Sequence, residues 1–169
     1  MQISTHRLGS SHRDITGRVR DIADQAAYLV TQNVGPIGHV DLVVTDDLGA
    51  KLVIRTAQQE LLGTRAKAGK GGRHRAGATT VSPSGILVVI NADASLHRQR
   101  VEIDKTVIHE LVHAAQLSPA AARQDAIAGL RNNYGLVPMT RAAARTANDI
   151  VAAHERQAAD LERLATQLR

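Results

Sequence analysis

Two histidines stand four residues apart in the stretch TVIHELVHAAQ, and a glutamate directly follows the first of them. In a helix, residues i and i+4 lie one above the other, so His109 and His113 can present their imidazoles at the separation that two ligands of a tetrahedral zinc ion require. Glu110 can reach a metal-activated water without filling a coordination position, and can take its proton as a general base. The pattern therefore predicts a metal-dependent hydrolytic site.

The apolar residues around this motif favour the same interpretation. When each residue advances by about 100° around a helix, they fall on the side opposite His109, Glu110 and His113. They are Ile108, Leu111, Val112 and Ala115. We expect a helix with one apolar face and one face that carries the site.

The segment HELVHAAQ, preceded by the apolar run GILVVIN, resembles a minimal zincin of the gluzincin kind. A metzincin is excluded, because Gln116 and Pro119 stand where its glycine and third histidine would be. The resemblance covers residues 37–168 in element order, but only 109–113 in motif. It implies a zinc cofactor, a protein or peptide substrate paired with an edge strand, and a third ligand from a later helix.

Two neighbouring residues of the last predicted helix compete to be that third ligand. The resemblance favours Glu155, since gluzincin-like families often carry a ligand glutamate with small residues one turn later, as Ala158 and Ala159 are here. The same families often place Asp or Asn where Ala159 stands. Helical phase instead favours His154, which lies near the centre of the apolar stripe, with Glu155 at its edge. The predicted ligand set is completed by Glu155, with His154 as the alternative.

Three further side chains have both a chemical and a structural explanation. Tyr134 is one of two aromatic residues, and its phenol could hydrogen-bond an oxyanion or simply pack in the core. His97 and Arg98 follow a predicted strand, where they would contact a substrate or face water.

The elements that must position these residues are read from apolar spacing and turn signals. Helices are expected over 14–31, 104–117 with Asp104 as N-cap, 120–132 and 140–168. Strands are expected over 39–45 and 51–55, joined by a hairpin-like turn, and over the buried run 85–91. This order predicts an α+β fold: one zincin-like domain over residues 1–169, with an N-terminal helix, about three strands, the motif helix and a long C-terminal helix.

Composition limits the chemistry and the setting. The 169-residue chain has no cysteine, so disulfides and thiolate metal ligands are excluded. The N-terminus lacks the apolar core of a signal peptide, and the longest apolar run, 86–90, is far too short to span a membrane. We expect a soluble, cytoplasmic protein without a membrane partner, or a virion protein if the chain derives from a phage.

A basic, glycine-rich segment covers residues 63–75, with five Lys or Arg and four Gly. Glycine at this density predicts a flexible loop, which we extend to residue 80. The loop could contact nucleic-acid phosphates without sequence preference, although no aromatic residue accompanies it to stack on a base.

Three functions follow from these features. The leading one is a zinc-dependent peptidase in which Glu110 is the general base and the substrate pairs with strand 85–91 by β-augmentation. The alternative is a zincin-fold structural component of a larger assembly, such as a bacteriophage particle, with little or no turnover. The third is a nucleic-acid binder that uses the basic loop.

Overall fold

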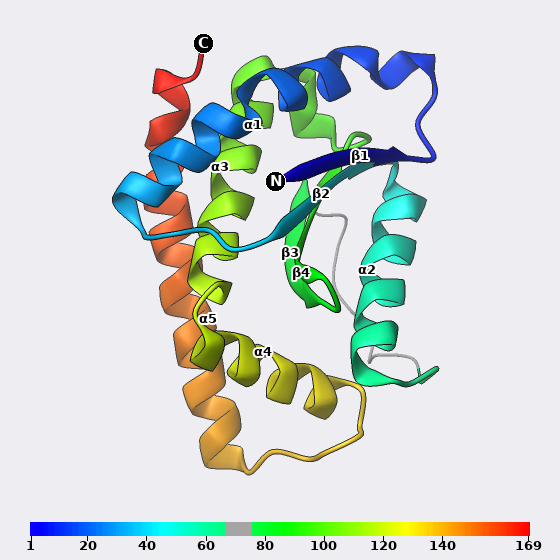
Figure 1. Ribbon diagram of the computed structural model, residues 1–169, viewed down its shortest axis with the longest axis vertical. Helices are drawn as coiled ribbons and strands as arrows, with labels where there is room; N and C mark the ends of the chain where they lie inside the picture. Colours follow the sequence, from blue (N-terminus) through cyan, green and yellow to red (C-terminus); the bar gives the residue numbers. More distant parts are fainter. Residues whose placement is uncertain (67–75) are drawn as a thin grey trace.

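The computed structural model describes residues 1–66 and 76–169, which form a four-stranded mixed sheet with helices on both faces (Figure 1). Its strands are β1 (Gln2–His6), β2 (Val40–Thr45), β3 (Gly77–Ser82) and β4 (Gly85–Asn91). The strand order is β1-β2-β4-β3. The first three strands of that order run parallel, and β3 lies antiparallel to β4 at the edge.

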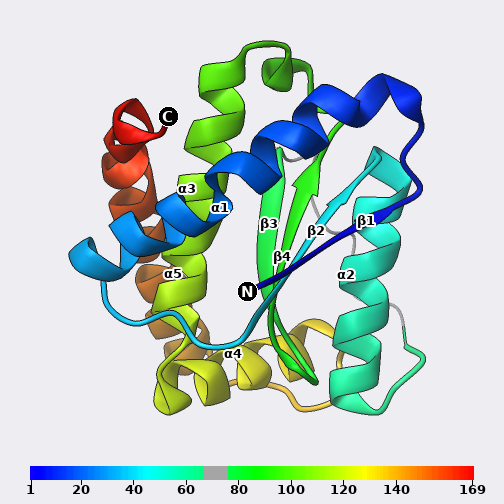
Figure 2. The same cartoon turned by 45° about the horizontal axis from the view of Figure 1, so that its top comes forward.

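The helices divide between the two faces of the sheet. They are α1 (Arg13–Asn33), α2 (Asp47–Leu62), α3 (Arg100–Leu117), α4 (Ala120–Asn133) and α5 (Arg141–Leu161), with short 3₁₀ segments η1 (Ser10–His12), η2 (Ser95–Arg98) and η3 (Glu162–Gln167). Figures 1 and 2 show α1 and α3 on one face, α2 on the other, and α5 alongside α3. The molecule is therefore an α+β fold in which α3 lies between the sheet and α5.

The main core fills the space between the sheet, α1, α3 and the C-terminal segment. A smaller apolar cluster lies under α2, where Val43, Leu87 and Val89 pack against it. Almost all of α3 from Ile103 to Gln116 is buried. The face that carries the histidines is thus itself partly covered by other elements, in addition to the expected apolar face.

Several predicted elements are confirmed. The helices expected over 14–31 and 120–132 are α1 and α4, and the strands expected over 39–45 and 85–91 are β2 and β4. The long last helix is present but ends at Leu161, where the chain tightens into η3.

The prediction of a strand over 51–55 is wrong, because these residues lie inside α2. Asp46 caps this helix: its side chain accepts a hydrogen bond from the backbone N–H of Gly49 at 2.6 Å. At the other end Gly63 adopts the left-handed conformation with a φ of 62°. Two caps and an apolar face against the sheet therefore outweigh the β-branched residues of this run.

The sheet also differs from the expected one at both edges. Strand β1 was not predicted, since its one core-facing apolar residue, Ile3, gives little periodic signal. Residues 77–80, expected as loop, belong to β3, whereas 67–75 lie outside the described residues. Strand β4 is paired on both sides, so it is not available for β-augmentation, and the edge strands are β1 and β3.

Asp104 is not the N-cap of the motif helix, which begins at Arg100 after Gln99. The Asp104 carboxylate is buried in the first half of α3, where it accepts hydrogen bonds from Arg18 at 2.7 and 2.6 Å. A guanidinium from α1 offsets the cost of burying this charge, so the helix can start one turn earlier.

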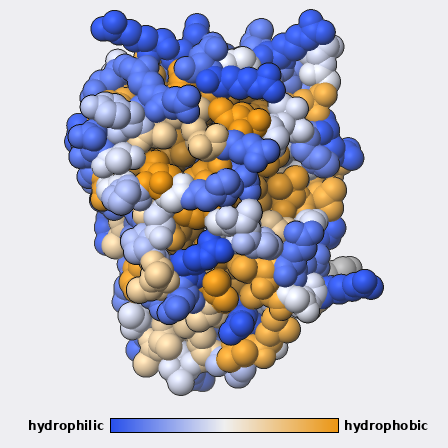
Figure 3. Space-filling view, viewed as in Figure 1, coloured by the Kyte–Doolittle hydropathy of each residue, from blue (hydrophilic) through white to orange (hydrophobic). Residues whose placement is uncertain are grey.

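The surface carries both apolar and polar residues. On the face shown in Figure 3, apolar residues reach solvent in several patches separated by polar side chains. Among the described residues, no helix has both the length and the apolar character that crossing a membrane requires.

Candidate metal centre

The side chains of His109 and His113 lie on the side of α3 that faces α5, one turn apart. Their side chains are 20% and 16% exposed, and Glu155 of α5, which is 49% exposed, approaches both. Two packed helices thus bring together residues that are 42 to 46 positions apart in the sequence. Glu155 stands at the half-open side of the cluster, where solvent and ligands have access.

The potential ligand atoms of these residues lie at the separations of a coordination sphere. Nε2 of His109 lies 3.1 Å from Nε2 of His113. The nearest Glu155 oxygens lie 3.5 Å from the first nitrogen and 3.7 Å from the second. Ligand atoms of a tetrahedral zinc ion with bonds of 2.0–2.1 Å are about 3.3 Å apart. The cluster therefore fits one small cation without a change of side-chain position larger than a few tenths of an ångström.

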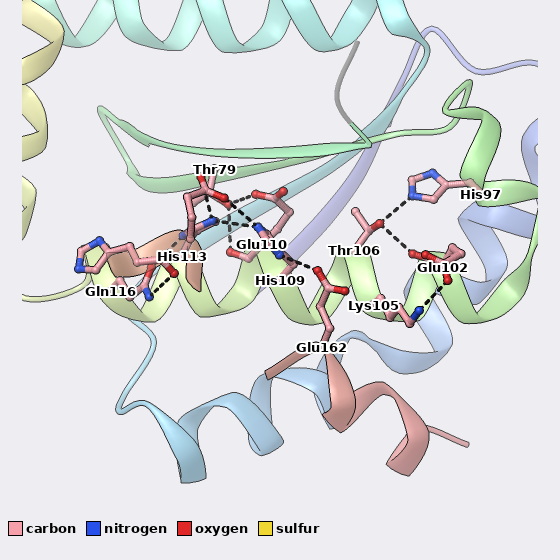
Figure 4. A network of polar contacts seen from close by, with 12 residues as sticks. Thr79, His97, Glu102, Lys105, Thr106, His109, Glu110, His113, Gln116 and Glu162 are labelled. Carbon is pink, nitrogen blue, oxygen red and sulfur yellow. Dashed lines mark hydrogen bonds and ion pairs between the residues drawn. The ribbon is translucent and has the colours of Figure 1, made fainter. Parts of the chain in front are cut away.

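Each imidazole is held from its outer side by another acceptor (Figure 4). Nδ1 of His109 lies 2.9 Å from Oε1 of Glu162, and Nδ1 of His113 lies 2.8 Å from Oε1 of Gln116. Because a carboxylate and an amide oxygen only accept hydrogen bonds, both Nδ1 atoms carry the proton. A neutral imidazole protonated at Nδ1 has its lone pair on Nε2, which is the atom that faces the cluster centre.

The centre of the cluster is consequently rich in electron pairs. Two Nε2 lone pairs and a carboxylate converge on one small volume, an arrangement that is favourable only with a positive charge between them. A proton shared by the two imidazoles or a metal ion would supply that charge. Among the described residues, this is the group of three metal-ligating side chains whose ligand atoms converge.

The electrostatics of His113 favour its neutral form. Burial lowers its pKa below the ordinary histidine value of 6.5, and His109 and His154 act in the same direction, against the opposing effects of Gln116 and Glu155. A histidine that loses its proton more readily is a better metal ligand near neutral pH.

Glu110 lies on the sheet side of α3 rather than on the α5 side. Its carboxylate, 6% exposed as a residue, accepts a hydrogen bond from the hydroxyl of Thr79 at 2.7 Å. Gly77 makes this approach possible, because a Cβ there would lie 2.6 Å from Cγ of Glu110. The edge strand β3 thus determines where the predicted general base can point.

The other sequence candidates have different places. His154 is not a member of the converging group; its backbone carbonyl accepts from Gln116, and burial lowers its pKa. The hydroxyl of Tyr134 donates to Gln58 of α2 at 3.1 Å.

The imidazole of His97 is also engaged, between the Asn91 carbonyl at 2.9 Å and Thr106 at 3.0 Å, whereas Arg98 is exposed. The hydrogen bonds of Tyr134 and His97 are therefore structural.

Sequence reasoning missed Glu162, Gln116 and the pair Thr79 and Gly77. Glu162 is the first residue of η3, and it lies about two helical turns after Glu155, on the same side of the last helical segment. Its spacing of seven residues from Glu155 was a sequence signal, since residues at i and i+7 share one face of a helix. Gln116, three residues after His113, is on the same side of the helix and was identifiable by spacing.

We compared the chain with known proteins at three levels. No protein-family model, curated protein or solved structure matches it.

Proposed function

We propose that this protein is a zinc-dependent peptidase in which His109, His113 and Glu155 hold the metal. The observation that carries the proposal is the convergence of two Nε2 lone pairs and one carboxylate at 3.1–3.7 Å, with both Nδ1 protons held by outer acceptors. Two histidines and one carboxylate leave one position of a tetrahedral ion open, which is typical of catalytic rather than structural zinc.

A zinc ion in this position would lower the pKa of a water molecule and polarise a carbonyl group. In this proposal Glu110 is the general base that would take a proton from the attacking water and deliver it to the leaving amine. Its hydrogen bond from Thr79 holds one carboxylate oxygen, Oε2, in a fixed place. This fixed orientation would keep the base aligned through the reaction.

The free edge of β3 is the proposed position of the substrate backbone. Among the described residues, β3 pairs only with β4, and its Thr79 touches Glu110. An extended peptide that pairs with this edge would pass beside both the base and the metal ligands. This replaces the strand 85–91, which the parallel neighbour β2 makes unavailable.

The proposal is tested with purified full-length protein. We expect about one zinc per chain, lost in His113→Ala, and zinc-dependent cleavage of a quenched-fluorescence peptide library. Glu110→Gln should retain the metal and reduce turnover by about 10²–10⁴-fold, which is the usual contribution of a general base. Glu102→Gln is the matched control, since Glu102 is on the same helix but pairs with Lys105.

Two results would contradict the proposal in different ways. Absence of bound zinc in the wild type would remove the metal site altogether. Zinc binding without cleavage of any library peptide, and with Glu110→Gln unchanged in every assay, would leave a structural metal module in place of an enzyme.

A further inference from the structure

Gln116 occupies a buried position between the two helices of the metal centre. It is 8% exposed and lies at the end of α3, one turn beyond His113. Its side chain makes three hydrogen bonds, and they connect different parts of the site. A residue with this many partners at such a junction fixes their relative positions.

The orientation of the Gln116 amide is determined by a backbone group. Its Nε2 lies 3.2 Å from the carbonyl oxygen of His154, which can only accept a hydrogen bond. The NH₂ end of the amide therefore faces α5, and a second donor hydrogen reaches Oε1 of Gln157 at 2.8 Å. The amide oxygen is left facing Nδ1 of His113 at 2.8 Å.

The two ends of this amide act on two different ligands of the proposed zinc ion. The oxygen holds the proton of His113 on Nδ1, so that the Nε2 lone pair points to the centre. The NH₂ group holds the carbonyl of the residue that immediately precedes Glu155. One side chain thus links the second ligand on α3 with the third ligand on α5.

We propose that Gln116 is a positioning residue that sets both the tautomer of His113 and the distance of Glu155 from the two histidines. This inference rests on the proposed metal centre. The residue touches neither metal nor substrate, and it acts through the groups that do. Its role explains how a ligand on a largely exposed helix keeps its place, since Glu155 itself is held by no described side chain other than the histidines.

The test compares Gln116→Leu with the wild type in two measurements. Zinc affinity, measured by competition with a chromophoric chelator, should fall by about 10–100-fold, as for other residues that orient metal-bound histidines. In the metal-free wild type at about pH 8, above the ordinary histidine pKa, ¹⁵N NMR should show the proton of His113 on Nδ1. In Gln116→Leu, the form protonated on Nε2 should appear.

A matched control separates positioning from helix packing. Gln25 makes the same kind of double contact, with the Gln167 carbonyl at 2.9 Å and the Arg169 N–H at 3.2 Å, and it lies on α1. Gln25→Leu should leave zinc affinity and the His113 tautomer unchanged.

The possible outcomes are distinct. Wild-type zinc affinity in Gln116→Leu would overturn the inference while leaving the metal centre intact. A wild-type protein without zinc affinity would overturn the proposed function and this inference together. If Gln116→Leu does not fold, the ¹⁵N NMR spectrum of the metal-free wild type still tests the inference. A proton on Nε2 of His113 would contradict the proposed role of Gln116.

Discussion

Helix α3 contains two groups of buried or partly buried polar side chains, and they are arranged differently. In its first half, opposite charges and complementary donors meet: Asp104 binds the guanidinium of Arg18 at 2.6–2.7 Å, and Thr106 contacts His97 at 3.0 Å. In its second half, Nε2 of His109 and Nε2 of His113 face each other at 3.1 Å, and the third group beside them is a carboxylate. Complementarity is present in the first group and is missing in the second.

This difference separates polar residues that stabilise the fold from polar residues that form the proposed metal site. A buried charge is tolerated when its partner is part of the protein, as Arg18 is for Asp104. Where lone pairs converge and the outer hydrogen bonds are already satisfied, the proposed metal ion would be the partner. The two halves should therefore respond differently to mutation: the first in stability and the second in cation binding.

The largest expected effect is a loss of stability when the polar group in the first half of α3 is disrupted. Asp104→Ala leaves the Arg18 guanidinium buried without its carboxylate, and should lower the free energy of unfolding by about 3–5 kcal/mol. Urea denaturation of the metal-free protein measures this directly. Asp14→Ala in the first turn of α1, where the side chain is exposed, is the control. A loss below about 1 kcal/mol would mean that the Arg18 pair does not belong to the structural group.

The next largest effect is expected on zinc affinity, in the variant Glu155→Ala, which removes the α5 carboxylate beside the second half of α3. Because this carboxylate is half exposed, its removal should change the stability of the metal-free protein by less than about 0.5 kcal/mol. Zinc affinity should nevertheless fall by more than about 100-fold, since one of three ligands is lost. Asp160→Ala, an exposed acid on the same helix, should change neither quantity. Equal zinc affinity in both variants would remove Glu155 from the site.

A smaller effect is expected for Glu162→Ala, which removes the outer acceptor of His109. Zinc affinity should fall by about 10–100-fold. The loss of zinc affinity should be smaller in Glu162→Gln, because the amide still offers an oxygen to Nδ1. Isothermal competition titrations of the two variants give this order. If the alanine variant binds zinc as the wild type does, the 2.9 Å contact is incidental.

The smallest expected effect is on the pH dependence of stability. It tests whether His97 belongs to the polar group that stabilises the fold. Burial lowers its pKa below 6.5, so the unfolded chain takes up a proton that the folded protein resists. This contribution to stability is fully present above pH 6.5 and is lost as the pH falls below it. His113 and His154 act in the same direction.

Urea midpoints of the metal-free protein should therefore decrease from pH 8 to pH 5, with a shallower decrease in His97→Gln. The exposed His39 gives the control variant, His39→Gln, which carries the same substitution at the surface. Identical slopes in all three proteins would contradict the assignment of His97.

The sequence was sufficient for the elements with a strong period. Helices α1 and α4 and strand β4 follow from apolar spacing, and the pair His109 and His113 follows from the motif. Helix α2 was misjudged because its β-branched residues resemble a strand, although Asp46 and Gly63 carry the capping signals.

The remaining parts depend on contacts between distant segments. Strand β3 gains its place by pairing with β4 and by the contact between Gly77 and Glu110, neither of which leaves a local pattern. The choice between His154 and Glu155 depended on the rotation of α5 against α3, which periodicity gives only to within about a quarter of a turn. Glu162 and Gln116 have helical spacing to the predicted ligands, but the atoms that they contact became clear only when both helices were in place.

The central claim is that the converging nitrogens and carboxylate hold a metal ion and not a shared proton. X-ray absorption at the zinc edge, on protein loaded with one equivalent of zinc, tests it most directly. We expect two imidazole nitrogens and oxygen ligands at about 2.0–2.1 Å, and loss of one nitrogen in His113→Ala. A spectrum of hydrated zinc, unchanged between the wild type and this variant, would contradict the claim and leave a proton between His109 and His113.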